Sequence, residues 1–137
     1  IVAQPNALTQ SKQIFEAETA GRNGPSVAKN NGGYTGKGYI DFQASSGEHL
    51  NWLIQTKSAG EHTLIFRYAL TDGSRPLQLK VNGKVIIKAL PFASTGSWTN
   101  WKTLTTTASL KAGVNDIRLE STGSSGPNID NLTIERN

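Results

Sequence analysis

The chain has 137 residues, which is enough for one domain with a sizeable core and too few for two. A composition of 36% hydrophobic and 18% charged residues excludes an intrinsically disordered protein, and no apolar run approaches the ~20 residues of a membrane-spanning helix. The net charge of +4 is dispersed rather than gathered into a patch, so neither nucleic acid nor a membrane is an expected partner. Cysteine is absent, which excludes disulfides and thiolate metal sites.

The chain divides into a short leading segment and one folded module. We interpret residues 1–13 as an N-terminal arm or linker remnant and residues 14–137 as the module. Within the module, turn-forming residues recur at short intervals and no helical apolar period persists. Period-two alternation instead predicts strands near 14–18, 38–43, 48–55, 61–70, 76–82, 84–88, 101–108, 114–121 and 128–135.

The fold class follows from this spacing. Asn82-Gly83 lies between two β-rich runs, and both residues tolerate the positive φ angles of a type I′ hairpin turn. Many short strands with regular turns are typical of an all-β, antiparallel β-sandwich or jelly roll. We expect that architecture.

Three carboxylates are unusual in such a sandwich. On a strand, Glu16 and Glu18 project from the same face within about 7 Å of each other, where like charges repel. Asp130 shares a strand face with Leu132 and Ile134, and no nearby Lys or Arg is an obvious partner for a carboxylate drawn toward the core. Since the first and last strands of a sandwich are often neighbours, one hypothesis is that the three carboxylates bind Ca²⁺. The alternative is an exposed glutamate pair and an aspartate that caps a turn.

Catalytic chemistry is not indicated. Two glutamates side by side on one strand are poorly placed to flank a glycosidic bond. The sequence has no Gly-x-Ser-x-Gly elbow, and His49 and His62 have no Ser or Asp at suggestive spacing. We interpret both histidines as surface or packing residues and expect no catalytic residue.

Some aromatic residues lie where loops are expected. Tyr34 follows two glycines and Trp98 lies in a segment rich in Ser, Thr and Gly, so each can serve as a platform for a sugar ring or can cover the end of the sandwich. Trp52 and Trp101 lie in strand-like runs and are expected in the core.

Seven motifs in a fixed order resemble a family 35 carbohydrate-binding module, with family 6 a close relative. The resemblance runs from about residue 14 to the C-terminus, through Phe-Glu-Ala-Glu (15–18), Gly-Gly-Tyr-Thr-Gly-Lys-Gly-Tyr-Ile-Asp-Phe (32–42), Arg67-Tyr68-Ala69, Leu-Lys-Val-Asn-Gly (79–83), Thr-Gly-Ser-Trp-Thr-Asn-Trp (95–101), Leu-Lys-Ala-Gly-Val-Asn-Asp-Ile-Arg-Leu (110–119) and Asn-Ile-Asp-Asn-Leu (128–132). It implies a galactose-binding-domain-like jelly roll. It also implies one structural calcium held by Glu16, Glu18 and Asp130, and Gly38 completes the predicted metal set.

The resemblance further implies a sugar site in the loops at one end of the sandwich. The matching positions are Tyr34, Asn128 and one of Trp98 and Trp101, of which we favour Trp98 because Trp101 begins a predicted strand.

Some family members bind uronic acids through an arginine and a second calcium. Arg75 lies in the corresponding loop, and a guanidinium forms a planar fork that matches a carboxylate. A solvated turn arginine is the alternative for Arg75. Asn31, with Asn30, is the candidate oxygen donor for the second ion.

The expected function is therefore a non-catalytic, calcium-dependent, monomeric module, secreted as part of a glycoside hydrolase, polysaccharide lyase or esterase. Its expected ligand is a polysaccharide containing glucuronic or unsaturated galacturonic acid, with neutral galactose- or mannose-containing chains as the alternative. Two other hypotheses remain open. One is a small polysaccharide-active enzyme with Tyr34 or His49 as its base, and the other is a protein-adhesion domain.

Overall fold

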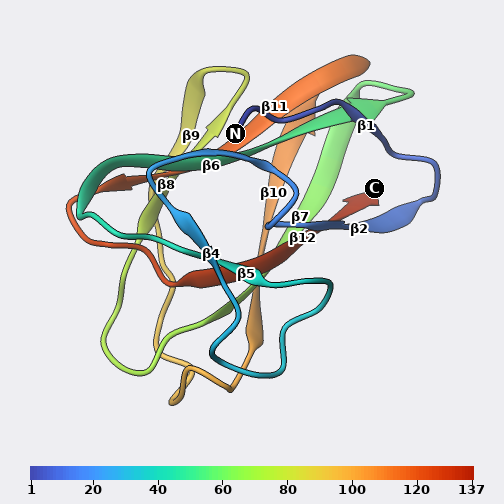
Figure 1. Ribbon diagram of the computed structural model, residues 1–137. Helices are drawn as coiled ribbons and strands as arrows, with labels where there is room; N and C mark the ends of the chain where they lie inside the picture. The colour runs from blue at the N-terminus through green and yellow to red at the C-terminus, as the bar shows by residue number, and fades with distance from the viewer.

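Two sheets packed face to face form the protein, as the alternating strands predict. The computed structural model describes residues 1–137 and contains no helix (Figure 1). No segment of it could cross a membrane as a helix. The predicted all-β sandwich is confirmed.

The first sheet has strand order β1-β6-β11-β8-β9, with β3 also paired to β6. Its strands are β1 (Asn6–Ala7), β3 (Gly21–Asn23), β6 (Ser46–Thr56), β8 (Leu77–Val81), β9 (Lys84–Leu90) and β11 (Gly113–Thr122). The β1–β6 pair is parallel and the other pairs are antiparallel. At the β8–β9 turn Asn82 and Gly83 have φ angles of 53° and 80°, as the hairpin prediction requires.

The second sheet has strand order β10-β7-β12-β5-β4, with β2 also paired to β12. Its strands are β2 (Lys12–Glu16), β4 (Ser26–Ala28), β5 (Tyr39–Asp41), β7 (Gly60–Ala69), β10 (Lys102–Leu110) and β12 (Asn128–Arg136). All of its pairs are antiparallel. The C-terminal strand β12 therefore lies between β7 and the N-terminal strand β2, which makes the first and last strands of this sheet neighbours as expected.

The core lies between the sheets and is built from the inward side of the period-two pattern. Leu64, Phe66 and Tyr68 of β7 all belong to it, as does Trp52 of β6, whose predicted core position is confirmed. Phe66 packs edge-on against Phe92 with ring centroids 6.2 Å apart. Burial of this continuous apolar face is the main stabilising contribution to the sandwich.

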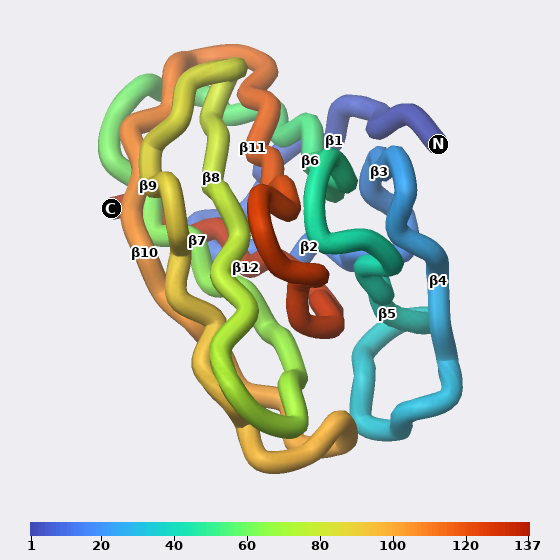
Figure 2. The backbone as a smooth tube through the Cα atoms, turned by 90° about the vertical axis from the view of Figure 1, so that its left-hand side faces the viewer, coloured from blue at the N-terminus to red at the C-terminus, as the bar shows by residue number.

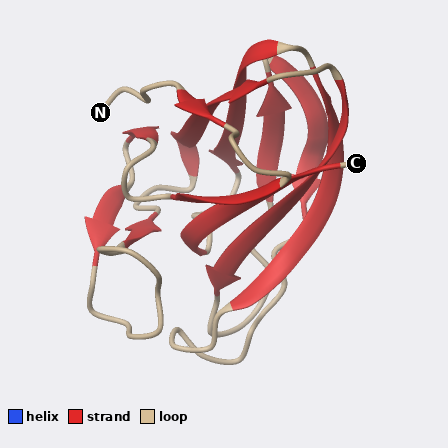
Figure 3. Ribbon diagram, turned by 90° about the vertical axis from the view of Figure 1, so that its right-hand side faces the viewer, coloured by secondary structure: helices blue, strands red, loops and turns tan.

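Three connections gather at one end of the sandwich. They are residues 29–38 between β4 and β5, 70–76 between β7 and β8, and 91–101 between β9 and β10. In Figure 2 they lie at the bottom, opposite the β8–β9 turn, and in Figure 3 they form the lower edge of the molecule. We call this the loop end.

The leading segment packs against the sandwich. Residues 1–13, interpreted from the sequence as an arm or linker remnant, contribute β1 to the first sheet and the first two residues of β2, Lys12 and Gln13, to the second. Leu8 belongs to the core and is only 1% exposed, and its amide donates to the Gln55 carbonyl at 2.8 Å. The sequence did not indicate this because a two-residue strand shows no alternation.

Leu8→Ala tests whether the segment contributes to the stability of the fold. Removing a fully buried leucine side chain is expected to reduce the free energy of unfolding by about 2–4 kcal/mol. Denaturant titration measures the change, with Val2→Ala, at a residue 81% exposed, as the matched control. Equal stability of the two variants would show that the segment is dispensable.

Candidate functional site

A bulge in β12 decides the position of Asp130. Ile129 pairs with Tyr68 and Asn131 pairs with Arg67 on β7, so Asp130 is one extra residue in the ladder. The core keeps Ile129 and Leu132, while Asp130 and Asn131 both contact the Thr35 side chain on the outer face of the sheet. The expectation that Asp130 shares the core face of Leu132 and Ile134 is thus wrong, because the bulge breaks the period of two.

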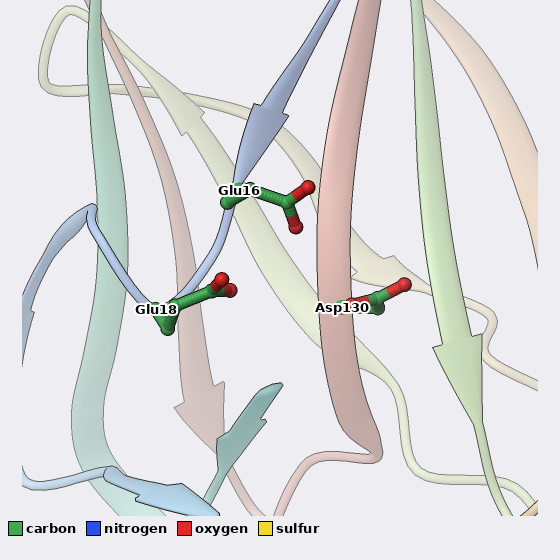
Figure 4. A group of neighbouring side chains, drawn as sticks. All are labelled: Glu16, Glu18 and Asp130. Carbon is green, nitrogen blue, oxygen red and sulfur yellow. The ribbon is translucent and has the colours of Figure 1, made fainter. Parts of the chain in front are cut away.

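The two glutamates approach the same place from β2 and the turn after it. Glu16 pairs with Asn131 of β12, and its neighbour Phe15 points into the core. Figure 4 shows the carboxylates of Glu16 and Glu18 directed toward β12 and the Asp130 side chain running toward β7. One carboxylate oxygen from each of the three residues lies within 4.8 Å of the others. The predicted clustering is therefore present.

The loop 29–38 closes over this cluster. The Thr35 amide donates to both oxygens of Asp130 at 3.0 and 3.1 Å, and its hydroxyl donates to Glu16 at 2.7 Å. The Lys37 amide donates to Oε2 of Glu18 at 2.7 Å. Each carboxylate thus accepts at least one hydrogen bond from the loop, which ties the loop to β2 and β12.

Asp130 has a cationic partner that the sequence did not reveal. Nη1 of Arg67 donates to Oδ2 of Asp130 at 2.5 Å and to the Gly33 carbonyl at 2.9 Å. The Asp130 side chain is 0% exposed and that of Arg67 is 28% exposed. Only the pairing of β7 with β12 brings these residues together, since they are far apart in the sequence.

Burial and mutual repulsion disfavour the ionised carboxylates. Burial raises the pKa of Asp130 above its ordinary value, although hydrogen bonds from Arg67 and Thr35 and the charge of Arg67 oppose the shift. Burial also raises the pKa of Glu16, with smaller contributions from the charges of Glu18 and Asp130 and an opposing hydrogen bond from Thr35. Negative charge on Glu16 and Asp130 is therefore less favourable in the folded protein than in water.

The donor set fits a hard divalent cation. Oε1 of Glu18 is buried and has no hydrogen-bond partner. Gly36 has a φ of 65°, and a Cβ there would collide with Oε2 of Glu18 and lie 2.9 Å from Cδ of Glu16, so only glycine leaves this space open. Three carboxylates with an unpartnered oxygen and no histidine or cysteine suit Ca²⁺ better than zinc.

An aromatic surface lies next to the cluster at the loop end. The rings of Tyr34 and Tyr39 have centroids 5.7 Å apart, and those of Tyr39 and Trp101 are 5.2 Å apart. Tyr39 is fully buried, and its hydroxyl accepts from the Asn31 amide at 2.9 Å. Tyr34 and Trp101 are half-buried. We call Asn31, Tyr34, Tyr39 and Trp101 the aromatic surface.

Trp101 is not a core residue, which corrects the sequence prediction. Strand β10 begins at Lys102, so Trp101 still belongs to the loop. Its Nε1 donates to the Gly32 carbonyl at 2.8 Å, and its ring lies 5.6 Å from the guanidinium carbon of Arg67. Trp98, expected as the exposed platform, is instead partly buried against the core.

Arg75 and Trp98 form a separate group. The guanidinium carbon of Arg75 lies 5.5 Å from the Trp98 ring. Burial raises the pKa of Asp41, while the Gln43 amide and the charge of Arg75 oppose that shift. The structure thus pairs Arg75 with Trp98, and no hydrogen bond, ion pair or ring contact joins this pair to the aromatic surface.

The remaining predicted residues lie nearby. Asn128 is buried at the start of β12, paired with Ala69. Gly38 is buried beside the Ala28 carbonyl, whereas the loop residues in contact with the cluster are Thr35, Gly36 and Lys37. The role of Gly38 as a metal ligand stays a prediction.

Sequence reasoning missed Arg67, Thr35 and Tyr39. In the sequence Arg67 stands out only as part of a strand motif, although the alternation of Leu64, Phe66 and Tyr68 places it on the outward face. Thr35 and Tyr39 lie inside the glycine-rich motif 32–42, where no periodic pattern marks individual contacts.

The chain thus forms a β-sandwich with a carboxylate cluster and an aromatic surface at its loop end. The family profile described as "Carbohydrate binding module (family 6)" matches residues 16–136. The chain therefore belongs to this group of carbohydrate-binding modules, and its structural neighbours place it in family 35.

Two curated relatives are larger carbohydrate-active enzymes. The chain is 38% identical over 122 residues to an exo-beta-D-glucosaminidase of Amycolatopsis orientalis, covering 88% of this chain and 12% of the relative. It is 32% identical to a cycloisomaltooligosaccharide glucanotransferase of Niallia circulans, covering 92% of this chain and 13% of the relative. The chain thus spans about an eighth of the length of these relatives.

Two solved structures show the same fold over whole modules. A family 35 module from Paenibacillus barcinonensis has a TM-score of 0.89 and 37% identity, covering 91% of this chain and 99% of that one. The Xyl-CBM35 module, in complex with a glucuronic acid containing disaccharide, has a TM-score of 0.80 and 30% identity, covering 90% and 92% of the two chains.

Glu16→Gln tests the electrostatic description of the cluster. The folded pKa of Glu16 is raised above its ordinary value of 4.5, so the folded state holds the proton longer than the unfolded state does. Glu16 therefore contributes most to the free energy of unfolding at low pH, and this contribution is lost as the pH rises through the interval above 4.5. In EDTA the glutamine variant, which cannot ionise, is expected to become more stable than the parent as the pH rises through that interval.

Thermal melts in EDTA from pH 4 to pH 8 measure this difference. In calcium chloride the order is expected to reverse, because the parent keeps a carboxylate ligand. Glu61→Gln, at an exposed glutamate of β7, is the control. The description fails if the Glu16 variant follows the control in both buffers.

Proposed function

We propose that this chain is a calcium-dependent carbohydrate-binding module that recognises a uronic acid at its loop end and holds an attached enzyme on its polysaccharide. One observation carries the proposal. The loop 29–38 contributes Asn31 and Tyr34 to the aromatic surface and Thr35 and Lys37 to the carboxylate cluster. A cation bound by the cluster would therefore hold the loop that presents the sugar-binding side chains.

The aromatic surface supplies what a pyranose ring requires. The half-buried rings of Tyr34 and Trp101 offer apolar faces, and Asn31 offers an amide beside them. Such sites combine apolar contact with a few polar groups that fix orientation. Both aromatic rings are held by neighbours, so little side-chain entropy is lost on binding.

Calcium would provide positive charge that neutralises the three carboxylates. Glu16, Glu18 and Asp130 would hold it, with the free Oε1 of Glu18 as an available ligand atom. Thr35 and Lys37 keep these carboxylates oriented through hydrogen bonds. Calcium binding would thus stabilise the junction between β2, β12 and the loop.

An acidic ligand is supported by two features. Arg75 presents a guanidinium at the loop end, and the chain has a net charge of +4. The related Xyl-CBM35 module is known in complex with a disaccharide that contains glucuronic acid. A neutral ligand is the alternative, supported by the likeness to a cycloisomaltooligosaccharide glucanotransferase.

Attachment to a catalytic domain would let the module hold that domain close to its polysaccharide. The chain covers 12% and 13% of two enzyme relatives, so in those proteins the corresponding region is a small part of a longer chain. Tethering raises the effective concentration of substrate at the linked active site without any bond chemistry in the module. A parent among secreted glycoside hydrolases, lyases, esterases or transferases fits this role.

Calorimetric titration tests the ligand class. Glucuronic acid is expected to bind in calcium chloride and to lose about tenfold or more in affinity in EDTA, equivalent to about 1.4 kcal/mol. Galactose, mannose and isomaltotriose are the neutral comparisons. Binding heat from a neutral sugar and none from glucuronic acid would show that the ligand is neutral. Binding heat from none of these sugars would contradict the proposed function.

Trp101→Ala and Trp98→Ala decide which tryptophan contacts the sugar. Because Trp101 is part of the aromatic surface and Trp98 packs against the core, loss of Trp101 is expected to weaken sugar affinity about tenfold, while loss of Trp98 mainly lowers stability. Sugar titration and a thermal melt of each variant separate the two effects. The opposite pattern would restore the sequence-based preference for Trp98.

A further inference from the structure

Arg67 contacts both groups of residues described above. Its Nη1 donates to the buried Asp130 carboxylate at 2.5 Å and to the Gly33 carbonyl at 2.9 Å. Its guanidinium carbon lies 5.6 Å from the centroid of the Trp101 ring, within cation–π range. Arg67 is the one side chain whose hydrogen bonds and ring contacts reach both the carboxylate cluster and the ring of Trp101.

Trp101 and the loop hold each other in place beside this guanidinium. Nε1 of Trp101 donates to the Gly32 carbonyl at 2.8 Å. Gly33 has a φ of 99°, and a Cβ there would lie 2.8 Å from Cδ1 of Trp101, so the loop backbone touches the indole directly. A change in the Arg67 position therefore acts on the indole in two ways, through the ring face and through the Gly33 carbonyl.

We propose that Arg67 is the positioning residue that couples the cation site to the sugar site. A cation at the cluster and the guanidinium share the Asp130 carboxylate, so cation binding changes the charge that Asp130 presents to Arg67. Arg67 transmits that change to Gly33 and Trp101. By linkage, a sugar that stacks on Trp101 must affect cation affinity by the same factor as the cation affects sugar affinity.

This coupling predicts effects of opposite sign on the two ligands. Arg67→Gln removes a positive charge beside the cluster, so calcium affinity is expected to stay equal or to rise. Sugar affinity is expected to fall, because Trp101 and the loop lose a shared contact. A residue that only supported the fold would weaken both.

The test reads the indole of Trp101 directly and needs no sugar. In ¹⁵N-labelled protein, calcium chloride is expected to shift the Trp101 indole resonance, which is assigned from Trp101→Phe. In Arg67→Gln the shift is expected to fall to roughly half or less, while calorimetry shows that calcium still binds. Arg118→Gln is the matched control, because Arg118 is 31% exposed and also lies beside carboxylates, in the other sheet.

Each outcome supports or overturns the coupling. An unmoved Trp101 resonance in the parent, an unchanged shift in Arg67→Gln, or a joint loss of calcium affinity and stability in that variant overturns it. If Arg67→Gln fails to fold, Arg67→Lys keeps the charge without the planar fork and is expected to show a reduced indole shift.

The proposal depends on the calcium part of the proposed function, and its failure can be told apart from failure of the sugar part. A parent protein that binds no calcium overturns the coupling, whereas sugar titration tests sugar recognition separately. Where a sugar binds, the ratio of its affinity in calcium to its affinity in EDTA is expected to approach one in Arg67→Gln and to remain at about tenfold or more in the control, as in the parent.

Discussion

The Asp130 carboxylate is the group around which the second sheet and the loop end are arranged. It is fully buried, and a buried charge is tolerated only when hydrogen bonds and opposite charge compensate its loss of hydration. Thr35 supplies the hydrogen bonds from the loop 29–38, and Arg67 supplies the charge from β7. Because these partners come from separate parts of the chain, satisfying one carboxylate fixes the relative positions of β12, β7 and the loop.

With Glu16 and Glu18 beside Asp130, the negative charge of the cluster exceeds the positive charge of Arg67. The two glutamates add two carboxylates close to Asp130. Burial raises the pKa of both Glu16 and Asp130, and the charges of Glu18 and Asp130 add to the shift of Glu16. A single Arg cannot neutralise three carboxylates, so a divalent cation is the natural complement. In a chain without cysteine, such an ion would join the first and last strands of the sheet as a disulfide joins them elsewhere.

The loop end shows how a rigid sandwich supports a binding surface. Tyr39 is held at the start of β5, and Trp101 packs against it in a tilted arrangement immediately before β10. The backbone of the glycine-rich loop approaches the indole closely, which orders a loop that carries few apolar side chains of its own. The aromatic surface therefore depends on strand ends and on the carboxylate cluster. Arg75 and Trp98 form a second group in the loops of the same end.

The sequence alone determined the all-β class, most strands, the Asn82-Gly83 turn and the three acidic residues, because alternation and turn chemistry are local properties. Tertiary structure alone decided the rest. The bulge in β12 places Asp130 outside the core face, and the pairing of β7 with β12 places Arg67 beside it. Because β10 begins only at Lys102, Trp101 lies in the loop and contacts Tyr39 instead of the core. Leu8 directly follows the two-residue strand β1 and belongs to the core, although no alternation in the sequence marks it. These positions depend on register and long-range pairing, which residue periodicity does not encode.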